Sequence, residues 1–128
     1  MPREPFAHDA VLSMDPGADD RAPGGAITVA LCGSWEHDPP CPLAPHHTGR
    51  ERMGDRLRLR VLFAAEADDE HRVRATIERA LAEGTDASPP GGTTTWRVVR
   101  TAASEVGPEE REHAERLVRS RSQRPGDP

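Results

Sequence analysis

The 128-residue chain contains no lysine, asparagine or tyrosine, so all 17 of its basic residues are arginine. Without lysine there is no amine for Schiff-base catalysis, and without tyrosine or asparagine two common proton and oxyanion donors are missing. Any chemistry must therefore use histidine, cysteine, carboxylate, hydroxyl or arginine side chains. Aromatic residues (3%) and hydrophobic residues (34%) are also scarce, which predicts one modest core and one domain.

Positive charge is also in short supply, since the formal net charge is −5 at neutral pH. This balance disfavours general binding to nucleic acids or to anionic membranes, because both need a positive field. No apolar run is long enough to span a membrane, and the N-terminal residues lack the apolar stretch of a secretion signal. We therefore expect a cytoplasmic protein whose two cysteines remain thiols.

Proline and glycine, at 13 and 11 residues, gather mostly outside the regularly patterned segments. Residues 1–25 are polar and end in Pro23-Gly24-Gly25, so we expect a disordered N-terminal tail there. Residues 121–128 are expected to form a second disordered tail. Between them, residues 26–120 are expected to fold as a single α+β domain. High arginine, alanine, glycine and proline contents are typical of high-GC bacterial coding and indicate nothing about function.

Alternating apolar and polar residues predict three strands, over residues 26–32, 56–65 and 95–101. The strand over 56–65 has the strongest pattern, with apolar side chains on one face at Leu57, Leu59, Val61 and Phe63.

Two helices are predicted, over residues 68–83 and 108–120. The first has acidic residues in its first turn and Gly84 just past its end, where a left-handed residue commonly terminates a helix. Its apolar stripe consists of Val73, Ile77, Ala80 and Leu81. The second opens with Pro108, a residue favoured at the first helical position.

The element order β-β-α-β-α predicts a small two-layer α+β sandwich. A right-handed crossover through the first helix places the third strand parallel to the second. If the first strand pairs antiparallel with both, the three-stranded sheet has the order 2-1-3 with two helices on one face. This topology resembles half of a split βαβ sandwich, a likeness that implies no function.

Both cysteines and half of the histidines fall between the first two predicted strands, in the segment 32–47. Zinc in proteins takes four nitrogen or sulfur ligands in a tetrahedron. The segment therefore predicts a zinc-binding loop, with Glu36 and Asp38 as hydrogen-bonding partners of the ligands. The predicted ligands are Cys32, His37, Cys41 and His46, with His47 as a substitute.

Two other interpretations of the same loop stay open. No pair of cysteines two residues apart is present, although that spacing marks most structural zinc motifs. The histidines and thiols can therefore be ordinary loop residues. Alternatively, a cysteine beside His37 or His46 can form a thiolate nucleophile, or three ligands with an open position can form a catalytic zinc site.

A row of arginines, Arg56, Arg58 and Arg60, projects from one side of the second predicted strand, and Arg97 of the third can join it. These arginines can form a surface for an anion or an acidic partner. The order 2-1-3 favours a structural explanation, because it makes the second strand an edge, where charges prevent unwanted pairing.

The sequence therefore favours a small cytoplasmic module that binds zinc or a partner through the loop over residues 32–47. The alternatives are a small enzyme that uses the same loop and a metal-free module that pairs with a protein or with a second copy of itself. The sequence leaves open whether the protein is an enzyme, and on balance disfavours it.

Overall fold

The computed structural model describes residues 3–32, 44–86 and 93–119. Within these ranges no helix is both long and apolar enough to cross a membrane. In chain order the elements are β1 (Arg3–Ser13), α1 (Ala22–Cys32), β2 (His46–Met53), β3 (Arg56–Glu66), the 3₁₀ turn η1 (Ala67–Asp69), α2 (Glu70–Ala82), β4 (Thr85–Asp86), β5 (Thr94–Thr95), β6 (Arg97–Ser104), the 3₁₀ turn η2 (Pro108–Glu110) and α3 (Arg111–Arg119).

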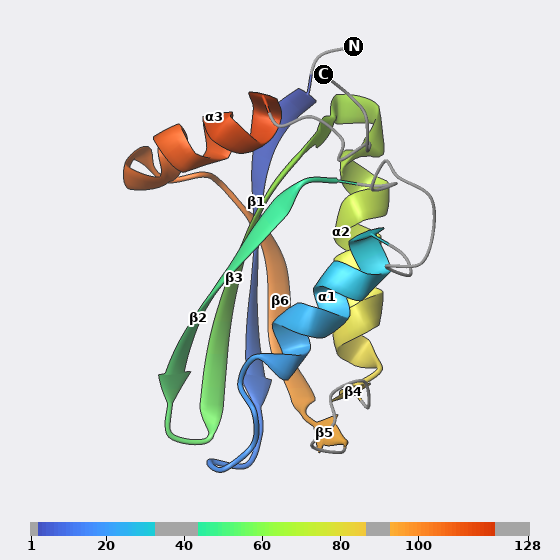
Figure 1. Ribbon diagram of the computed structural model, residues 1–128, viewed down its shortest axis with the longest axis vertical. Helices are drawn as coiled ribbons and strands as arrows, with labels where there is room; N and C mark the ends of the chain where they lie inside the picture. Colours follow the sequence, from blue (N-terminus) through green and yellow to red (C-terminus); the bar gives the residue numbers. More distant parts are fainter. Residues whose placement is uncertain (1–2, 33–43, 87–92, 120–128) are drawn as a thin grey trace, which may run out of the picture.

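The main sheet has four antiparallel strands in the order β2-β3-β1-β6. Strand β1 pairs antiparallel with both β3 and β6, so β3 and β6 run parallel to each other and are joined through α2. The N-terminal half of the domain has the same arrangement: α1 joins β1 to the parallel strand β2, and β3 lies between these two strands in the sheet. This is the split βαβ connectivity of ferredoxin-like domains. Helices α1 and α2 lie side by side against the sheet, and α3 lies apart from them at one end (Figure 1).

The hydrophobic core lies between the sheet and the helices α1 and α2. Alternate residues of the central strands point into it, which is why the alternation in β3 is so regular. The fully buried side chains include Leu12 of β1, Ile27 and Leu31 of α1, Leu57, Leu59, Val61 and Phe63 of β3, and Val73, Ile77 and Leu81 of α2.

The structure confirms the α+β class and four of the five predicted elements. The strands β3 and β6, the helix α2 and the last helix lie close to where the sequence places them. All four residues of the predicted α2 stripe are buried, and Gly84 has the left-handed φ of 70° expected at its end.

The prediction of a disordered tail over residues 1–25 is wrong, because these residues include β1, which pairs on both sides within the sheet. Phe6, His8, Ala10 and Leu12 occupy one face of β1, opposite core residues of β3. The sequence does not show this alternation clearly, because one of the inward positions is a polar residue, His8, whose side chain is only 2% exposed.

The predicted strand over residues 26–32 is also wrong, because this segment belongs to α1. Ile27 and Leu31, four residues apart, are fully buried, whereas Val29 between them is 50% exposed. The burial therefore follows the helical period. The segment is so short that its apolar residues fit the two-residue repeat of a strand as well as the repeat of a helix.

The predicted sheet order needs correction for the same reason. The central position, antiparallel to the strands at 56–65 and 95–101, is occupied by β1 and not by residues 26–32. A fourth strand, β2, adds to the outer side of β3. The helices also differ from the prediction, because α3 contacts β1 and β3 on the face opposite to α1 and α2.

Candidate functional site

The sheet face turned away from α1 and α2, here called the open face, is a grid of four strands and four rows. Strand register places side chains of β2, β3, β1 and β6 beside one another in each row. From the α3 end, the rows are His47, Leu62, Ala7 and Ser104; Gly49, Arg60, Asp9 and Ala102; Glu51, Arg58, Val11 and Arg100; and Met53, Arg56, Ser13 and Arg97.

Helix α3 packs on the sheet at the first of these rows. Leu62 and Ala7 are buried there although they point away from the main core. Ala114 of α3 is 1% exposed, and α3 contacts both β1 and β3. The small side chains at Ala7 and Ala114 let the helix approach the sheet closely.

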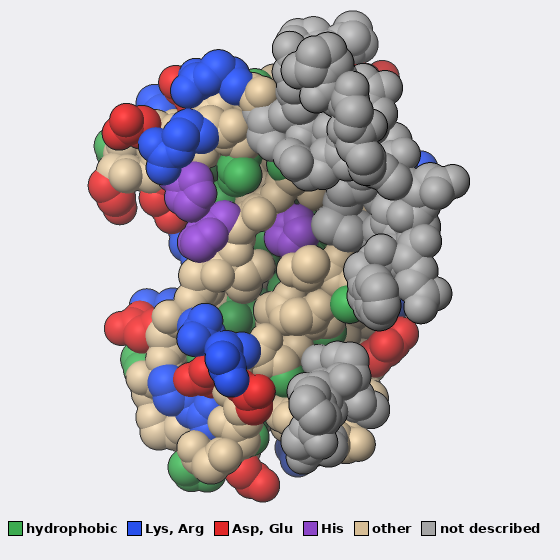
Figure 2. Space-filling model, viewed as in Figure 1, with side chains coloured by type: hydrophobic (Ala, Val, Ile, Leu, Met, Phe, Trp, Pro, Cys, Tyr) green, Lys and Arg blue, Asp and Glu red, His purple; other side chains and the backbone are tan. Residues whose placement is uncertain are grey.

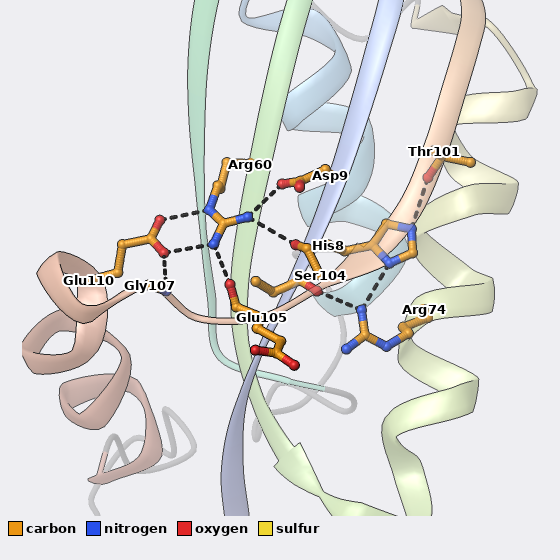
Figure 3. A network of polar contacts seen from close by, with 10 residues as sticks. His8, Asp9, Arg60, Arg74, Thr101, Ser104, Glu105, Gly107 and Glu110 are labelled. Carbon is orange, nitrogen blue, oxygen red and sulfur yellow. Dashed lines mark hydrogen bonds and ion pairs between the residues drawn. The ribbon is translucent and has the colours of Figure 1, made fainter.

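Arg60 of β3 forms hydrogen bonds to η2, β1 and β6 at this end of the open face (Figure 3). Its Nε and Nη2 donate to the two carboxylate oxygens of Glu110 in η2, each at 2.7 Å. Its Nη1 donates to Asp9 at 2.8 Å and to Ser104 at 2.9 Å. The Arg60 hydrogen bonds hold the pKa of the Glu110 carboxyl at about 2, and Glu110 in turn raises the pKa of Arg60. This arginine already binds a carboxylate with both arms of its guanidinium group.

Beyond Arg60 the open face has a hollow of about 380 Å³, lined by residues of β1, β3 and β6. Its lining includes Val11, which Arg58 and Arg100 flank in register on either side, and also Arg60 and the carboxylate of Asp9. The neighbouring strands lie about 4.8 Å away on each side, so the two arginines stand roughly 10 Å apart across an apolar strip.

The two rows farthest from α3 carry an excess of positive charge. Four arginines, Arg56, Arg58, Arg97 and Arg100, occupy them together with one carboxylate, that of Glu51. Within the residues described, no acidic side chain lies within ion-pair distance of Arg97 or Arg100, and the Arg58–Glu51 pair is a distant 3.7 Å. These two rows therefore have a local excess of positive charge, although the chain as a whole has a net charge of −5.

The structural explanation for this arginine row does not hold. Strand β3, which carries three of the arginines, lies inside the sheet between β2 and β1. An interior strand needs no charges to prevent pairing at an edge. The sequence analysis also missed Arg100, because a β-bulge opposite Val11 and Leu12 shifts the register of β6 and brings both Arg97 and Arg100 onto the same face.

The predicted zinc ligands are only partly visible. His37 and Cys41, with Glu36 and Asp38, lie outside the described residues. Cys32 is the last residue of α1. His46 and His47 are neighbours in β2, so their side chains point to opposite faces of the sheet and they are not interchangeable ligands. No group of three or more histidine, cysteine or carboxylate side chains that could hold a metal is present among the described residues.

His46 points toward α1. Its Nδ1–H donates to the carbonyl of Ala44 at 3.1 Å, which leaves Nε2 to accept from the Thr28 hydroxyl at 2.9 Å. Burial lowers the pKa of His46, so the ring is neutral near pH 7.

His47 lies on the open face against His113 of α3, with ring centroids 4.6 Å apart. Figure 2 shows two adjacent histidine side chains on the surface beside α3. Burial, and the charge on His113, lower the pKa of His47. The sequence analysis placed His47 in the zinc loop and gave no role to His113, because nothing in the sequence brings α3 to β2.

His8 is a buried polar residue between the sheet and α2. Its Nδ1 accepts from Arg74 at 3.0 Å, and its Nε2 lies 2.8 Å from the Thr101 hydroxyl (Figure 3). The same Nε2 lies 3.1 Å from Glu78. Because arginine only donates, the proton of the neutral ring is on Nε2. Burial lowers the pKa of His8. Every polar atom of the ring is satisfied, so the residue is structural.

Comparison with known proteins identifies no relative: no family model, no curated protein and no solved structure matches this chain. The connectivity of the sheet alone carries no function. Functional inference therefore depends on the chemistry of the open face and of the histidines.

Proposed function

We propose that this domain is a protein-interaction module. It binds a short acidic segment of a partner on the part of its open sheet face that lies away from α3. The observation that carries the proposal is the hollow over Val11 with Arg58 and Arg100 on either side. Guanidinium groups bind carboxylates through paired hydrogen bonds. Within the same sheet, Arg60 binds the Glu110 carboxylate in that way.

The size and composition of the surface favour a peptide over other anionic partners. The four strands span roughly 15 Å, and the two rows lie roughly 7 Å apart along the strands. This area is small for a stable interface between two folded domains but sufficient for a few residues of extended chain. Single-stranded nucleic acids bind open sheets by stacking bases on aromatic side chains. The sixteen grid positions contain no phenylalanine, tyrosine or tryptophan.

An octaglutamate peptide titrated into the full chain at low ionic strength tests this proposal. We expect saturable binding that weakens as salt is added, and a loss of about tenfold in affinity in the double variant Arg58→Gln/Arg100→Gln. The matched control is Arg72→Gln/Arg79→Gln, which removes the same charge from α2 on the other side of the sheet and leaves binding within about twofold.

Equal losses in both double variants would show that only net charge matters and would overturn the proposal. So would the absence of peptide binding at low salt, or tighter binding of a single-stranded RNA of equal charge through the same two arginines.

A second candidate function is the zinc site in the loop over residues 32–47, which the position of His46 favours. Metal-binding histidines commonly donate one ring N–H to a backbone carbonyl and present the other nitrogen to the ion. His46 donates to Ala44 in this way, and its Nε2, which accepts from the Thr28 hydroxyl of α1 at 2.9 Å, lies near the helical turn that ends at Cys32 and would have to exchange this bond for the ion. Zinc in the untagged protein that is lost in Cys41→Ser supports this site, and its absence in the wild type contradicts it.

A further inference from the structure

The contact between β2 and α3 brings together two imidazoles that belong to distant parts of the chain. His47 stands in the first row of the open face, beside Leu62, and His113 precedes Ala114, the buried residue of α3. The packing of Ala114 against the sheet therefore determines where His113 lies. The two rings are tilted by 52° with centroids 4.6 Å apart, and both side chains are at least partly exposed.

The separation of the rings fits a shared metal ion. An imidazole nitrogen binds Zn²⁺ at 2.0–2.1 Å, so two imidazoles on one tetrahedral ion hold their ring centres roughly 5 Å apart. The observed 4.6 Å differs from this value by a few tenths of an ångström, which a small rotation of either exposed side chain supplies. The tilt also suits chelation, since neither ring blocks the other by lying flat on it.

One carboxylate lies near the pair, and solvent can reach both side chains. The Glu110 carboxylate interacts electrostatically with His113, while its own oxygens are held by Arg60 and by the Gly107 N–H at 2.8 Å. His47 is exposed and His113 is partly exposed, so water molecules can complete the coordination of an ion. Imidazole suits Zn²⁺, Cu²⁺ and Ni²⁺ and does not suit Mg²⁺ or Ca²⁺, which take oxygen ligands.

We propose that His47 and His113 form a two-histidine site for a divalent transition-metal ion, with Zn²⁺ as the simplest occupant, that clips α3 to β2. The site is separate from the predicted loop site, because His47 points away from α1 and from His46. It is also distinct from the acidic-peptide surface, whose hollow is lined by the row of Arg60 and Asp9 and by the row beyond it. The bound ion stabilises the docked position of α3, because it contacts both elements only when they lie together.

The test measures the unfolding midpoint of Cys32→Ser/Cys41→Ser protein against ZnCl₂, because this background removes two of the four predicted loop ligands. We expect a saturable rise in the midpoint at micromolar zinc and no rise with MgCl₂. Adding His47→Gln or His113→Gln lowers the apparent zinc affinity by more than about tenfold. The control, His71→Gln on α2, leaves the affinity unchanged.

Hydrogen exchange and nuclear magnetic resonance give a second readout that does not depend on unfolding. Zinc is expected to shift the ring signals of His47 and His113 but not those of buried His8, and to slow amide exchange in α3. The proposal is overturned if zinc stabilises the His113→Gln protein as strongly as its parent, if the cysteine-free protein responds only at millimolar zinc, or if the shifted signals belong to His46 alone.

Discussion

Gly84 ends α2 in a conformation that suits no other residue. Its φ is 70°, and a Cβ atom built on it would lie 2.7 Å from the carbonyl oxygen of Trp96. This close approach allows two hydrogen bonds. The Trp96 N–H donates to the Gly84 carbonyl at 2.9 Å, and the indole Nε1–H donates to the Leu81 carbonyl at 2.9 Å. These bonds attach the chain before β6 to the end of α2.

Replacing this glycine should therefore be costly. We predict that Gly84→Ala lowers the free energy of unfolding by about 3 kcal/mol, because backbone strain adds to the clash with Trp96. Gly54→Ala, at φ 63° with open space around it, incurs the strain alone, about 1 kcal/mol. Gly17→Ala has neither problem and should change little. Urea unfolding of the three variants checks the order, and equal losses at Gly84 and Gly54 would contradict it.

At the scale of elements, α3 is the least securely attached helix. It is nine residues long, and its buried side chain is the single methyl group of Ala114. Polar contacts therefore carry much of its docking. The main one is the Glu110–Arg60 pair in η2, where Arg60 is 30% exposed and Glu110 22%, so water screens the pair only in part.

We predict that Glu110→Gln lowers the free energy of unfolding by about 2 kcal/mol and speeds amide exchange in α3 more than in α2. The glutamine keeps one acceptor for Arg60 but loses the ionic component of the bond. Glu112→Gln is the matched control, because Glu112 is 88% exposed and lies 3.8 Å from Arg116. Uniform exchange changes throughout the protein would show that α3 does not open separately.

At the scale of the whole molecule, ionisation should make the fold sensitive to acid in two steps. The pKa values of His8, His46 and His47 all lie below the ordinary value, chiefly because of burial. The unfolded chain therefore binds more protons than the folded one as the pH falls through about 6.5, and stability falls with it. Glu110 acts in the same direction at lower pH, since its pKa is about 2 in the folded protein.

We predict that the free energy of unfolding is highest above about pH 7, falls between about pH 7 and 5, and falls again between about pH 5 and 2. Denaturant unfolding across this range gives the profile. The second step should shrink in Glu110→Gln, and the first should shrink in His8→Gln, whose side chain remains neutral. A profile with no slope between pH 7 and 5 would contradict the assignment of neutral buried histidines.

The sequence predicted those elements whose apolar residues repeat over enough turns to exclude other periods. Strand β3 alternates through Leu57, Leu59, Val61 and Phe63, and α2 repeats Val73, Ile77, Ala80 and Leu81 over a little more than two turns; all are buried as expected. Gly84 marked the end of α2 for a local steric reason. The sequence also predicted correctly that the strands at 56–65 and 95–101 run parallel, because the handedness of a crossover depends on chain chirality.

Tertiary structure decided the rest. Whether residues 26–32 form a strand or a helix depended on which side chains could be buried, and His8 became a core residue because Arg74, Thr101 and Glu78 satisfy its nitrogens. The arginines of β3 could be interpreted only from the sheet order, because β1 and β2 flank β3 and its charges therefore do not protect a sheet edge. The pairing of His47 with His113 joins residues 66 positions apart, and such contacts arise from the packing of α3 on the sheet, about which no local pattern carries information.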